Sequence, residues 1–478
     1  MKILQVNTSD RGGGAEGVAW NLHNEYRRQG HEAWLAVGAR RGNDEGQGEE
    51  EREGLLQIPL WQPRNPWAVA CRAAARLLRP WAGKARGADR LSRVFQSLSE
   101  PLNFLRRELG HEVFDYPGAR RLLSLPPERP DVVQCHNLHG PLLPRGGYFD
   151  LRWLPRLCRQ APVVMTLHDM WLATGHCAHT FDCERWKTGR LHCPDLTVYP
   201  AIRRDATARN WRVKQRIYEQ SRFYVATPSL WLMRRIEQSM LRPAIVETRI
   251  IPNGVDLTVF HPGDKEAARA SLDIPAGAAA LLFAANGIRR NIWKDYVTLR
   301  DAIALASAEL GGRDTLFIAL GEDAPPETIG RARIRFVPYQ TNPRDVARYY
   351  QAADLYLHAA RVDTFPTTVI EALACGAPVV ATDVGGIPEQ VRDGGNGCLV
   401  APQDSRTMAN KIIELLNDKE KRRRMGEQAA ASARARFSLD RQTAAYLNWF
   451  SDILRARQPG ASSQATGGAA RTPRKEKD

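Results

Sequence analysis

The chain has 478 residues, of which 43% are hydrophobic and 25% charged, and it carries a formal net charge of +15. This composition excludes wholesale disorder and a small cross-linked scaffold, and the length allows two or three domains. The positive charge predicts attraction to polyanions, whether nucleic acid, anionic lipid or phosphorylated small molecules.

The sequence predicts a cytoplasmic protein. No stretch reaches the roughly 18 consecutive apolar residues that a membrane-spanning helix requires. The first seven residues are typical of a buried strand and lack the apolar core of a signal peptide. Five of the eight cysteines stand in apolar contexts that suit reduced, buried thiols.

Short β-rich runs alternate with helical patterns along the chain, which predicts βαβ units and parallel sheets. The first series of predicted strands covers 2–6, 33–37, 132–135, 163–166 and 223–227. The second series covers 280–284, 315–320, 334–337, 355–358, 379–382 and 397–400, with a helix at 346–352. We therefore predict an α/β protein with two doubly wound, Rossmann-like domains that face each other across a cleft.

The turn-rich segment 241–262 separates the two series. We predict an N-terminal domain at 1–245 and a C-terminal domain at 246–435. A last helix at 436–458 is expected to pack back on the N-terminal domain, and 459–478 to form a disordered tail.

An insertion at about 60–110 departs from this rhythm. Residues 64–107 hold ten basic and two acidic side chains, a local balance of +8. Large apolar residues recur among them at helical spacing. Two interpretations stay open: an inserted helical hairpin with a basic solvent-exposed face, or helices that lie on an anionic membrane surface.

The most informative stretch is 361–402. A helix is predicted over 366–375, with Pro366 in its first turn, Asp363 or Thr364 as its cap, and Gly376 at its end. The N-terminus of such a helix offers unsatisfied N–H groups and a partial positive charge, which suit a diphosphate.

Several side chains and backbone groups of this stretch are candidates for binding a nucleotide-sugar. Glu371 lies about one turn into the helix, where a carboxylate can hold ribose hydroxyls. A Gly-Gly turn permits close backbone approach by the sugar or its phosphates. The candidate binding residues are Phe365, Thr367, Thr368, Glu371, Gly385 and Gly386.

In this order the features resemble the signature of family 4 glycosyltransferases, retaining GT-B enzymes related to glycogen and sucrose synthases. The resemblance covers about 1–455 and is strongest at 361–400. In that family two glutamates, with seven residues between them, touch the nucleotide-sugar. Here Asp363 and Glu371 hold those positions, so the first glutamate is shortened to aspartate. The resemblance implies catalytic roles for both.

Other positions match the same family in the expected order. Gly13 and Gly14 follow the first strand and open a helix, as a loop that approaches phosphate or sugar does. Lys294 resembles the lysine that neutralises the donor diphosphate, and Arg289 is its candidate companion. The resemblance implies catalysis without a bound metal.

Histidines close two of the predicted strands. His168 follows the strand at 163–166, and ligands of open α/β sheets bind beyond the carboxyl ends of strands. The resemblance implies that a histidine here approaches the donor sugar and the acceptor. His136 also ends a strand but is expected to lie further out.

A Cys- and His-rich segment at 175–194 holds Cys177, Cys183 and Cys193. It contains enough ligands for a tetrahedral zinc site, although their spacing is irregular. Three interpretations stay open: a reduced structural loop, a structural zinc site and a disulfide.

The resemblance implies a retaining hexosyltransferase of surface-polysaccharide or lipopolysaccharide biosynthesis, with a UDP-sugar favoured over a GDP-sugar. The acceptor would be a glycan or a polyprenyl-linked sugar, met at the inner face of the plasma membrane. The alternatives are a nucleotide-sugar epimerase, a glycoside phosphorylase and a catalytically inactive regulatory homologue. A nucleic-acid partner is not expected, because aromatic single-strand platforms and recognition helices are not evident.

Overall fold

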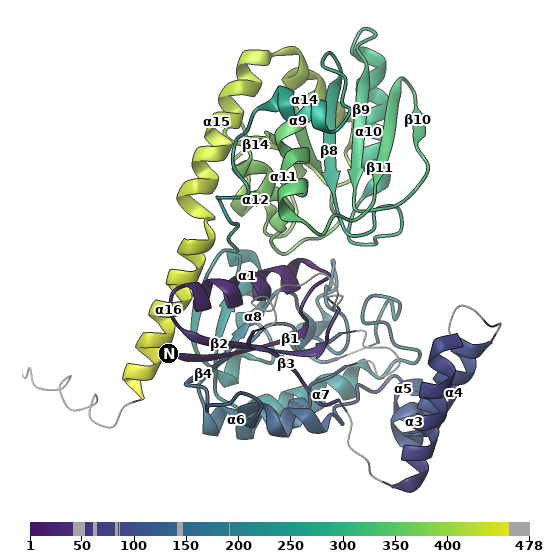
Figure 1. Ribbon diagram of the computed structural model, residues 1–478, viewed down its shortest axis with the longest axis vertical. Coiled ribbons are helices and arrows are strands. Elements are labelled where there is room, and N and C mark those ends of the chain that lie inside the picture. Colours follow the sequence, from purple (N-terminus) through teal and green to yellow (C-terminus); the bar gives the residue numbers. More distant parts are fainter. Residues whose placement is uncertain are drawn as a thin grey trace, which may run out of the picture.

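The computed structural model describes residues 1–41, 53–60, 65–81, 85, 87–140, 147–190 and 192–457. Within these ranges the chain forms two α/β domains, stacked one above the other in Figure 1. Each domain contains a seven-stranded sheet with helices on it, so the predicted fold class is confirmed. The predicted tail at 459–478 lies outside the described residues.

The sheet of the N-terminal domain has the strand order β3-β2-β1-β4-β5-β6-β7, and every neighbouring pair is parallel. Its central strands are buried on both faces, as parallel sheets require. The strands are β1 (Lys2–Ser9), β2 (Glu32–Ala39), β3 (Leu55–Gln57), β4 (Val132–Cys135), β5 (Val163–Thr166), β6 (Phe223–Thr227) and β7 (Ile245–Ile250). The helices of this domain body are α1 (Gly14–Arg28), α6 (Leu154–Gln160), α7 (Thr207–Glu219) and α8 (Leu230–Glu237), with 3-10 turns η2 (Pro117–Ser124), η3 (Leu151–Trp153), η4 (Trp171–Ala173), η5 (Arg185–Lys187) and η6 (Arg242–Ala244).

The second sheet has the order β10-β11-β9-β8-β12-β13-β14, parallel except for the edge strand β10. Its strands are β8 (Ala279–Ala284), β9 (Thr315–Leu320), β10 (Glu327–Ile329), β11 (Ala332–Val337), β12 (Leu355–His358), β13 (Val379–Thr382) and β14 (Gly397–Val400). The helices of this domain are α9 (Lys265–Ser271), α10 (Tyr296–Glu309), α11 (Pro343–Ala352), α12 (Thr367–Ala374), α13 (Ile387–Gln390), α14 (Ser405–Asn417) and α15 (Lys419–Arg436), and α16 (Leu439–Ala456) follows them.

The sequence patterns do not predict three of the strands, β3, β7 and β10. All three lie at sheet edges, where a strand has a neighbouring strand on only one side. In β7 burial does not alternate from residue to residue, and Glu247 and Arg249 form an ion pair at the surface. This strand extends the first sheet to Ile250, a few residues past the boundary expected at 246.

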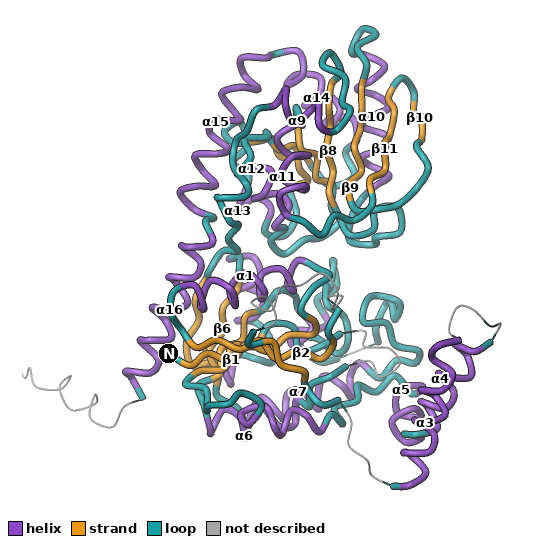
Figure 2. Tube along the Cα trace, in the orientation of Figure 1, coloured by secondary structure: helices purple, strands orange, loops and turns teal. Residues whose placement is uncertain are grey.

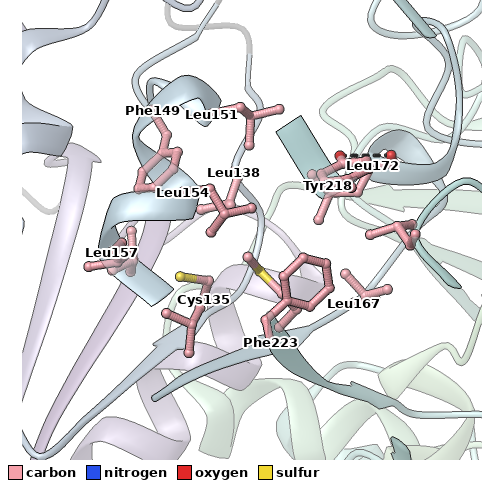
Figure 3. Packing of buried hydrophobic residues seen from close by; sticks show 14 of the residues in the cluster. Cys135, Leu138, Phe149, Leu151, Leu154, Leu157, Leu167, Leu172, Tyr218 and Phe223 are labelled. Carbon is pink, nitrogen blue, oxygen red and sulfur yellow. Dashed lines mark hydrogen bonds between the residues drawn. The ribbon is translucent and has the colours of Figure 1, made fainter. Parts of the chain in front are cut away.

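The core beside β4, β5 and β6 is close-packed, as Figure 3 shows. Leu154 and Leu157 of α6 pack there with Cys135, and Tyr218 of α7 packs with Phe223. The Tyr218 hydroxyl donates a hydrogen bond of 2.9 Å to the carbonyl oxygen of Leu172. This dense layer fixes the strand ends from which the loops of the cleft depart.

The last helix returns to the N-terminal domain. After α15, which lies against α12, helix α16 runs beside α1 (Figure 1). Tyr446, Trp449 and Phe450 of α16 are fully buried in one cluster with Tyr26 of α1 and Ile3 of β1.

The chain thus crosses between the domains twice, and the two crossings are paired. The Val255 N–H donates to the carbonyl of Phe437, and the Leu439 N–H donates to the carbonyl of Val255, both at 2.9 Å. A Cβ on Gly254 would lie 2.6 Å from the Ser438 carbonyl oxygen, so only glycine permits this approach.

The insertion forms a separate group of helices beside the N-terminal domain (Figure 2): α3 (Pro66–Leu78), α4 (Ala88–Leu98) and α5 (Pro101–Glu108), with the turn η1 (Arg79–Trp81). Many large apolar side chains here remain exposed, including Trp67 at 60%, Leu77 at 76% and Leu102 at 69%. No helix among the described residues is both long and apolar enough to cross a bilayer.

Candidate functional site

Both sheets place their switch points toward the space between the domains. The first sheet reverses its order between β1 and β4, and the second between β8 and β12. Loops that leave the carboxyl ends of such strands run to opposite sides and open a crevice for ligands. The candidate residues lie on these loops.

Lys294 and Asp363 come together at the second switch point. The Lys294 ammonium donates a hydrogen bond of 2.5 Å to Oδ2 of Asp363 and one of 3.2 Å to Nε2 of His358. Lys294 follows β8 and Asp363 follows β12, while His358 is the last residue of β12. An ammonium has three N–H donors, and within the described residues the third has no partner, so it can serve a ligand.

The electrostatics of this cluster favour an ionised Asp363 and a neutral His358. Burial alone would raise the pKa of Asp363, but the Lys294 ammonium and His358 hold it well below its usual range. Burial and the neighbouring ammonium lower the pKa of His358 to about 4. Sequence reasoning missed His358, although its place at the end of a predicted strand was a usable signal.

The N-terminus of α12 lacks a side-chain cap. The prediction that Asp363 or Thr364 caps this helix was wrong, because Pro366 holds the cap position and Asp363 is engaged by Lys294. The Thr364 hydroxyl is buried and has no hydrogen-bond partner in the described chain. Thr367 and Thr368 form the partly exposed first turn, and Phe365 packs its ring against Phe437. The first N–H groups of α12 therefore remain available to an anion.

Glu371 lies one turn further along α12 and accepts a hydrogen bond of 2.9 Å from the Tyr350 hydroxyl. Burial raises the pKa of Glu371 from 4.5 to about 7, although the Tyr350 hydroxyl acts in the opposite direction. Tyr350, on α11, is a second residue that sequence reasoning missed. Within the described part of the chain the other carboxylate oxygen has no hydrogen-bond partner, so it can accept from a ligand hydroxyl.

The raised pKa of Glu371 predicts a pH-dependent stability. Between about pH 4.5 and about pH 7 the folded chain binds more protons at this residue than the unfolded chain does. The free energy of unfolding should therefore fall as the pH rises through this window. Glu371→Gln should lose this part of the slope, which urea unfolding at several pH values measures in both proteins. Equal slopes would contradict the burial of this carboxyl.

The Gly385–Gly386 turn packs directly on the Asp363 loop. The Gly386 N–H donates a hydrogen bond of 3.1 Å to the Asp363 carbonyl. A Cβ on Gly385, which has φ +60°, would lie 1.7 Å from that same oxygen. A Cβ on Gly386 would lie 2.0 Å from the Thr364 carbonyl oxygen and 2.9 Å from Cβ of Ser229, across the cleft.

We expect Gly386→Ala to lower the free energy of unfolding by about 1–3 kcal/mol, because the new methyl group overpacks the contact with Thr364 and Ser229. Gly277→Ala is the matched control, since its Cβ would meet nothing within 4 Å. Denaturant unfolding compares the two variants. Equal free energies of unfolding in the two variants would contradict this prediction, because they would show that the turn accommodates the methyl group at no energetic cost.

The glycine-rich loop of the N-terminal domain meets the second domain. Gly13 caps α1, and the exposed Gly14 begins it. The Asn286 side chain, on the loop that leads to Lys294, donates a hydrogen bond of 2.8 Å to the Gly12 carbonyl. Gly13 and Gly14 thus lie close to the loop that carries Lys294.

Arg289 lines the same cavity of about 650 Å³ as Lys294, but its guanidinium is paired with other residues. Its Nε donates to Glu322 at 2.6 Å, and its guanidinium also lies 5.1 Å above the Phe336 ring. The Glu322 carboxylate in turn holds the Arg289 and Ile288 N–H groups. To bind a diphosphate, Arg289 would have to break its ion pair with Glu322.

His168 lies at the end of β5, partly exposed, and contacts His136. Its Nε2 lies 3.0 Å from Nδ1 of His136. His136 was expected to lie further out, but the β1-β4-β5 order brings both strand ends together. Nearby, Asp169 accepts a hydrogen bond of 2.7 Å from His139.

The Cys- and His-rich segment touches the Lys294 loop. The Phe181 ring stacks on Trp293 at 5.5 Å, and the His179 ring lies 5.0 Å from it. His176 Nε2 lies 3.1 Å from Sγ of Cys193, and Cys177, Cys183 and Cys193 form no disulfide. Among the described residues no three His, Cys, Asp or Glu side chains are grouped to hold a metal ion. The zinc interpretation stays a prediction.

A cavity of about 410 Å³ lies between the domains beside Gly385. Helix α8 lines it with Trp231, Arg234 and Arg235. The carboxylate of Glu389, from the C-terminal domain, crosses to accept from the Leu230 and Trp231 N–H groups at 2.8 Å. The start of α8 is therefore capped twice, by its own Ser229 side chain and by Glu389 of the opposite domain.

Residues 327–432 match the family model for glycosyl transferases group 1, and they contain Asp363, Glu371 and the Gly385–Gly386 turn. The match confirms the resemblance to glycosyltransferases for this part of the C-terminal domain. A D-inositol 3-phosphate glycosyltransferase of Mycolicibacterium paratuberculosis is 34% identical over 217 residues, which are 43% of this chain and 47% of that protein. The chain thus spans about half the length of the curated relatives it matches.

Solved structures share the fold over nearly the whole chain. HepE from Anabaena, in complex with UDP, has a TM-score of 0.59 at 18% identity and covers 95% of this chain and 100% of its own. A further HepE structure holds UDP-glucose. WaaG, a glycosyltransferase involved in lipopolysaccharide biosynthesis, has a TM-score of 0.54 at 16% identity, covering 95% of this chain and 99% of its own. These likenesses show the GT-B fold.

Proposed function

We propose that the protein is a retaining family 4 glycosyltransferase that moves a hexose from a nucleotide-diphosphate sugar to an acceptor. The observation that carries the proposal is the pairing of Lys294 with Asp363, directly before the uncapped start of α12. The loops after β8 and β12 thereby bring positive charge and free N–H groups together at a switch point of the sheet.

These groups suit the charge changes of sugar transfer. Breaking the anomeric C–O bond leaves negative charge on the departing diphosphate. The remaining Lys294 N–H and the first turn of α12 can stabilise that charge electrostatically, a role that divalent cations fill in other enzymes. Attack from the same face, with the leaving phosphate accepting the proton, retains the configuration and needs no nucleophilic carboxylate, unlike retaining glycosidases.

Each proposed binding residue has a role in this scheme. Glu371 would accept hydrogen bonds from ribose hydroxyls, and Asp363 would receive a hydroxyl of the sugar while Lys294 turns to the diphosphate. Gly385 and Gly386 would admit the sugar, and Gly13 and Gly14 the phosphates. His168 would contact the donor sugar and the acceptor from the opposite domain.

We propose a UDP-sugar as donor, which the UDP and UDP-glucose complexes of HepE support. The acceptor is proposed to be a glycan or polyprenyl-linked sugar of surface-polysaccharide or lipopolysaccharide biosynthesis. The cavity lined by Trp231 and Arg234 would receive it, since an indole face suits a sugar ring and a guanidinium an anionic group.

The acceptor is proposed to be met at an anionic membrane surface on the cytoplasmic side. The insertion helices support this, because their exposed Trp and Leu side chains stand beside exposed arginines at 76, 90, 93 and 106. Apolar side chains can enter the acyl boundary while arginines bind anionic headgroups.

Thermal-shift measurements against UDP-, GDP-, ADP- and dTDP-sugars, with and without EDTA, test the donor site. A bound donor raises the unfolding midpoint. We expect a shift with UDP-sugars that EDTA leaves unchanged and that Lys294→Ala and Glu371→Ala abolish. Lys419→Ala, on the exposed start of α15, should keep it.

Incubation with the identified donor then separates the reaction classes. Transfer to a lipid-linked glycan, in preference to inositol phosphate, would support the proposed acceptor. Conversion of the donor without any acceptor would indicate an epimerase, and dependence on free phosphate a phosphorylase. No shift with any nucleotide would favour an inactive homologue.

A further inference from the structure

Three polar side chains form a hydrogen-bonded chain beneath the cleft, from β1 through the end of β4 to the end of β5. Nε2 of Gln5 lies 3.1 Å from Nε2 of His136, and Nδ1 of His136 lies 3.0 Å from Nε2 of His168. Gln5 and His136 are buried, at 0% and 1% exposure. The two imidazole rings are inclined by only 11°.

Gln5 determines which atom donates in each of these hydrogen bonds. Nε2 of Gln5 also lies 3.2 Å from the carbonyl oxygen of Ala19, and a carbonyl only accepts. This atom is therefore the amide nitrogen, and its second N–H donates to Nε2 of His136. A neutral imidazole that accepts at Nε2 carries its proton on Nδ1, so His136 donates to Nε2 of His168.

Both rings are neutral near pH 7. Burial lowers the pKa of His168 to about 4, although the nearby Asp169 acts in the opposite direction. Burial also lowers the pKa of His136 well below its usual range. Positively charged imidazoles therefore do not disturb the proton positions that the Gln5 N–H sets on the two rings.

We propose that His136 is a positioning residue which, held by Gln5, fixes the proton of His168 on Nδ1. His168 then presents an N–H donor, and Nδ1 has no partner among the described residues. The inference rests on the proposed function for the ligand: the N–H would donate to a hydroxyl or phosphate oxygen of the bound substrates. His168 would then be a hydrogen-bond donor and not a general base.

Histidine-selective ¹⁵N NMR of the full chain tests the proton position without any substrate. His168→Ala assigns the resonances. We expect a protonated Nδ1 and an unprotonated Nε2 at His168. Gln5→Glu places an acceptor below His136 and should move the His168 proton to Nε2, while Gln5→Met should leave a mixture of the two tautomers. A protonated Nε2 in the unaltered protein would overturn the proposal.

Kinetics test the consequence. We expect His136→Ala to lower kcat about 10–100-fold, as loss of an orienting partner does, with the donor KM within about twofold. His136→Asn keeps an N–H donor near the position of Nδ1 and should recover most of kcat. His23→Gln is the control for replacing a buried histidine, since His23 lies on α1 and contacts the Glu53 carbonyl.

The outcomes separate this proposal from the proposed function. The expected tautomer in a protein without transferase activity would leave the chain of hydrogen bonds standing and count against the function. Active enzyme with wild-type kcat in folded His136→Ala would overturn the positioning role. Circular dichroism of each variant checks folding.

Discussion

Lys294→Met is expected to lower the rate constant for sugar transfer by about 10²–10³, because a preorganised donor to the developing charge is lost. The donor identified by thermal shift serves as substrate, and single-turnover kinetics report the chemical step. Lys294→Arg keeps the charge but not the compact ammonium, so it should recover only part of the rate. A rate within threefold of the unaltered enzyme would contradict the assigned role.

The same substitution should also destabilise the fold by about 2–3 kcal/mol, because the Asp363 carboxylate, 18% exposed, loses its charged partner. Lys294→Met with Asp363→Asn removes both charges. The double variant is therefore expected to be more stable than Lys294→Met alone while remaining inactive. Denaturant unfolding of the two proteins separates the loss of catalysis from the loss of stability.

Leu77→Ser, Trp81→Ser and Leu102→Ser together are expected to lower the partition coefficient onto anionic vesicles by about 10²–10⁴. Their side chains are 76%, 60% and 69% exposed. Burying each in the acyl boundary contributes roughly 1–2 kcal/mol, given its exposed area, and each 1.4 kcal/mol is about tenfold. Cosedimentation with phosphatidylglycerol-containing vesicles measures the change.

Val297→Ser is the matched control, because Val297 is 68% exposed but lies on the C-terminal domain. It should bind vesicles like the unaltered protein. Arg90→Glu with Arg93→Glu should weaken binding at low salt and reduce its salt dependence, since these arginines would meet the headgroups. Unchanged sedimentation of the triple serine variant would show that the exposed helices serve another partner.

The fold was predictable because most strands are buried on both faces and therefore appear as continuous apolar runs. The strands β4, β5, β6, β9, β12, β13 and β14 have the bounds expected from sequence. The edge strands were not predictable, because a strand with a neighbour on only one side need not be a continuous apolar run. The start of α12 was misjudged because Asp363, which suits a helix cap, forms a stronger charged pair with Lys294.

The candidate site was predictable only where a single chain segment carries the chemistry. The segment 361–402 has helix start, carboxylate and Gly-Gly turn in one stretch. Contacts between distant segments leave no local pattern in the sequence. His358 contacts Lys294, Tyr350 contacts Glu371, and Gln5 contacts His136. In each pair the two residues lie on different elements. Likewise, the pairing of Arg289 with Glu322 depends on two loops whose approach no local pattern encodes.

The paired crossings at Val255 and Phe437 to Leu439 restrict how the two domains can move. Two chain segments joined by a pair of backbone hydrogen bonds resist sliding past each other, which favours rotation about a line through them as the relative motion of the domains. Cleavage of one crossing would leave the domains joined by the other. Opening of the cleft would also have to release Glu389 from the start of α8, so in the open state the Leu230 and Trp231 N–H groups would lose this partner and the Ser229 side chain would be left to cap the helix.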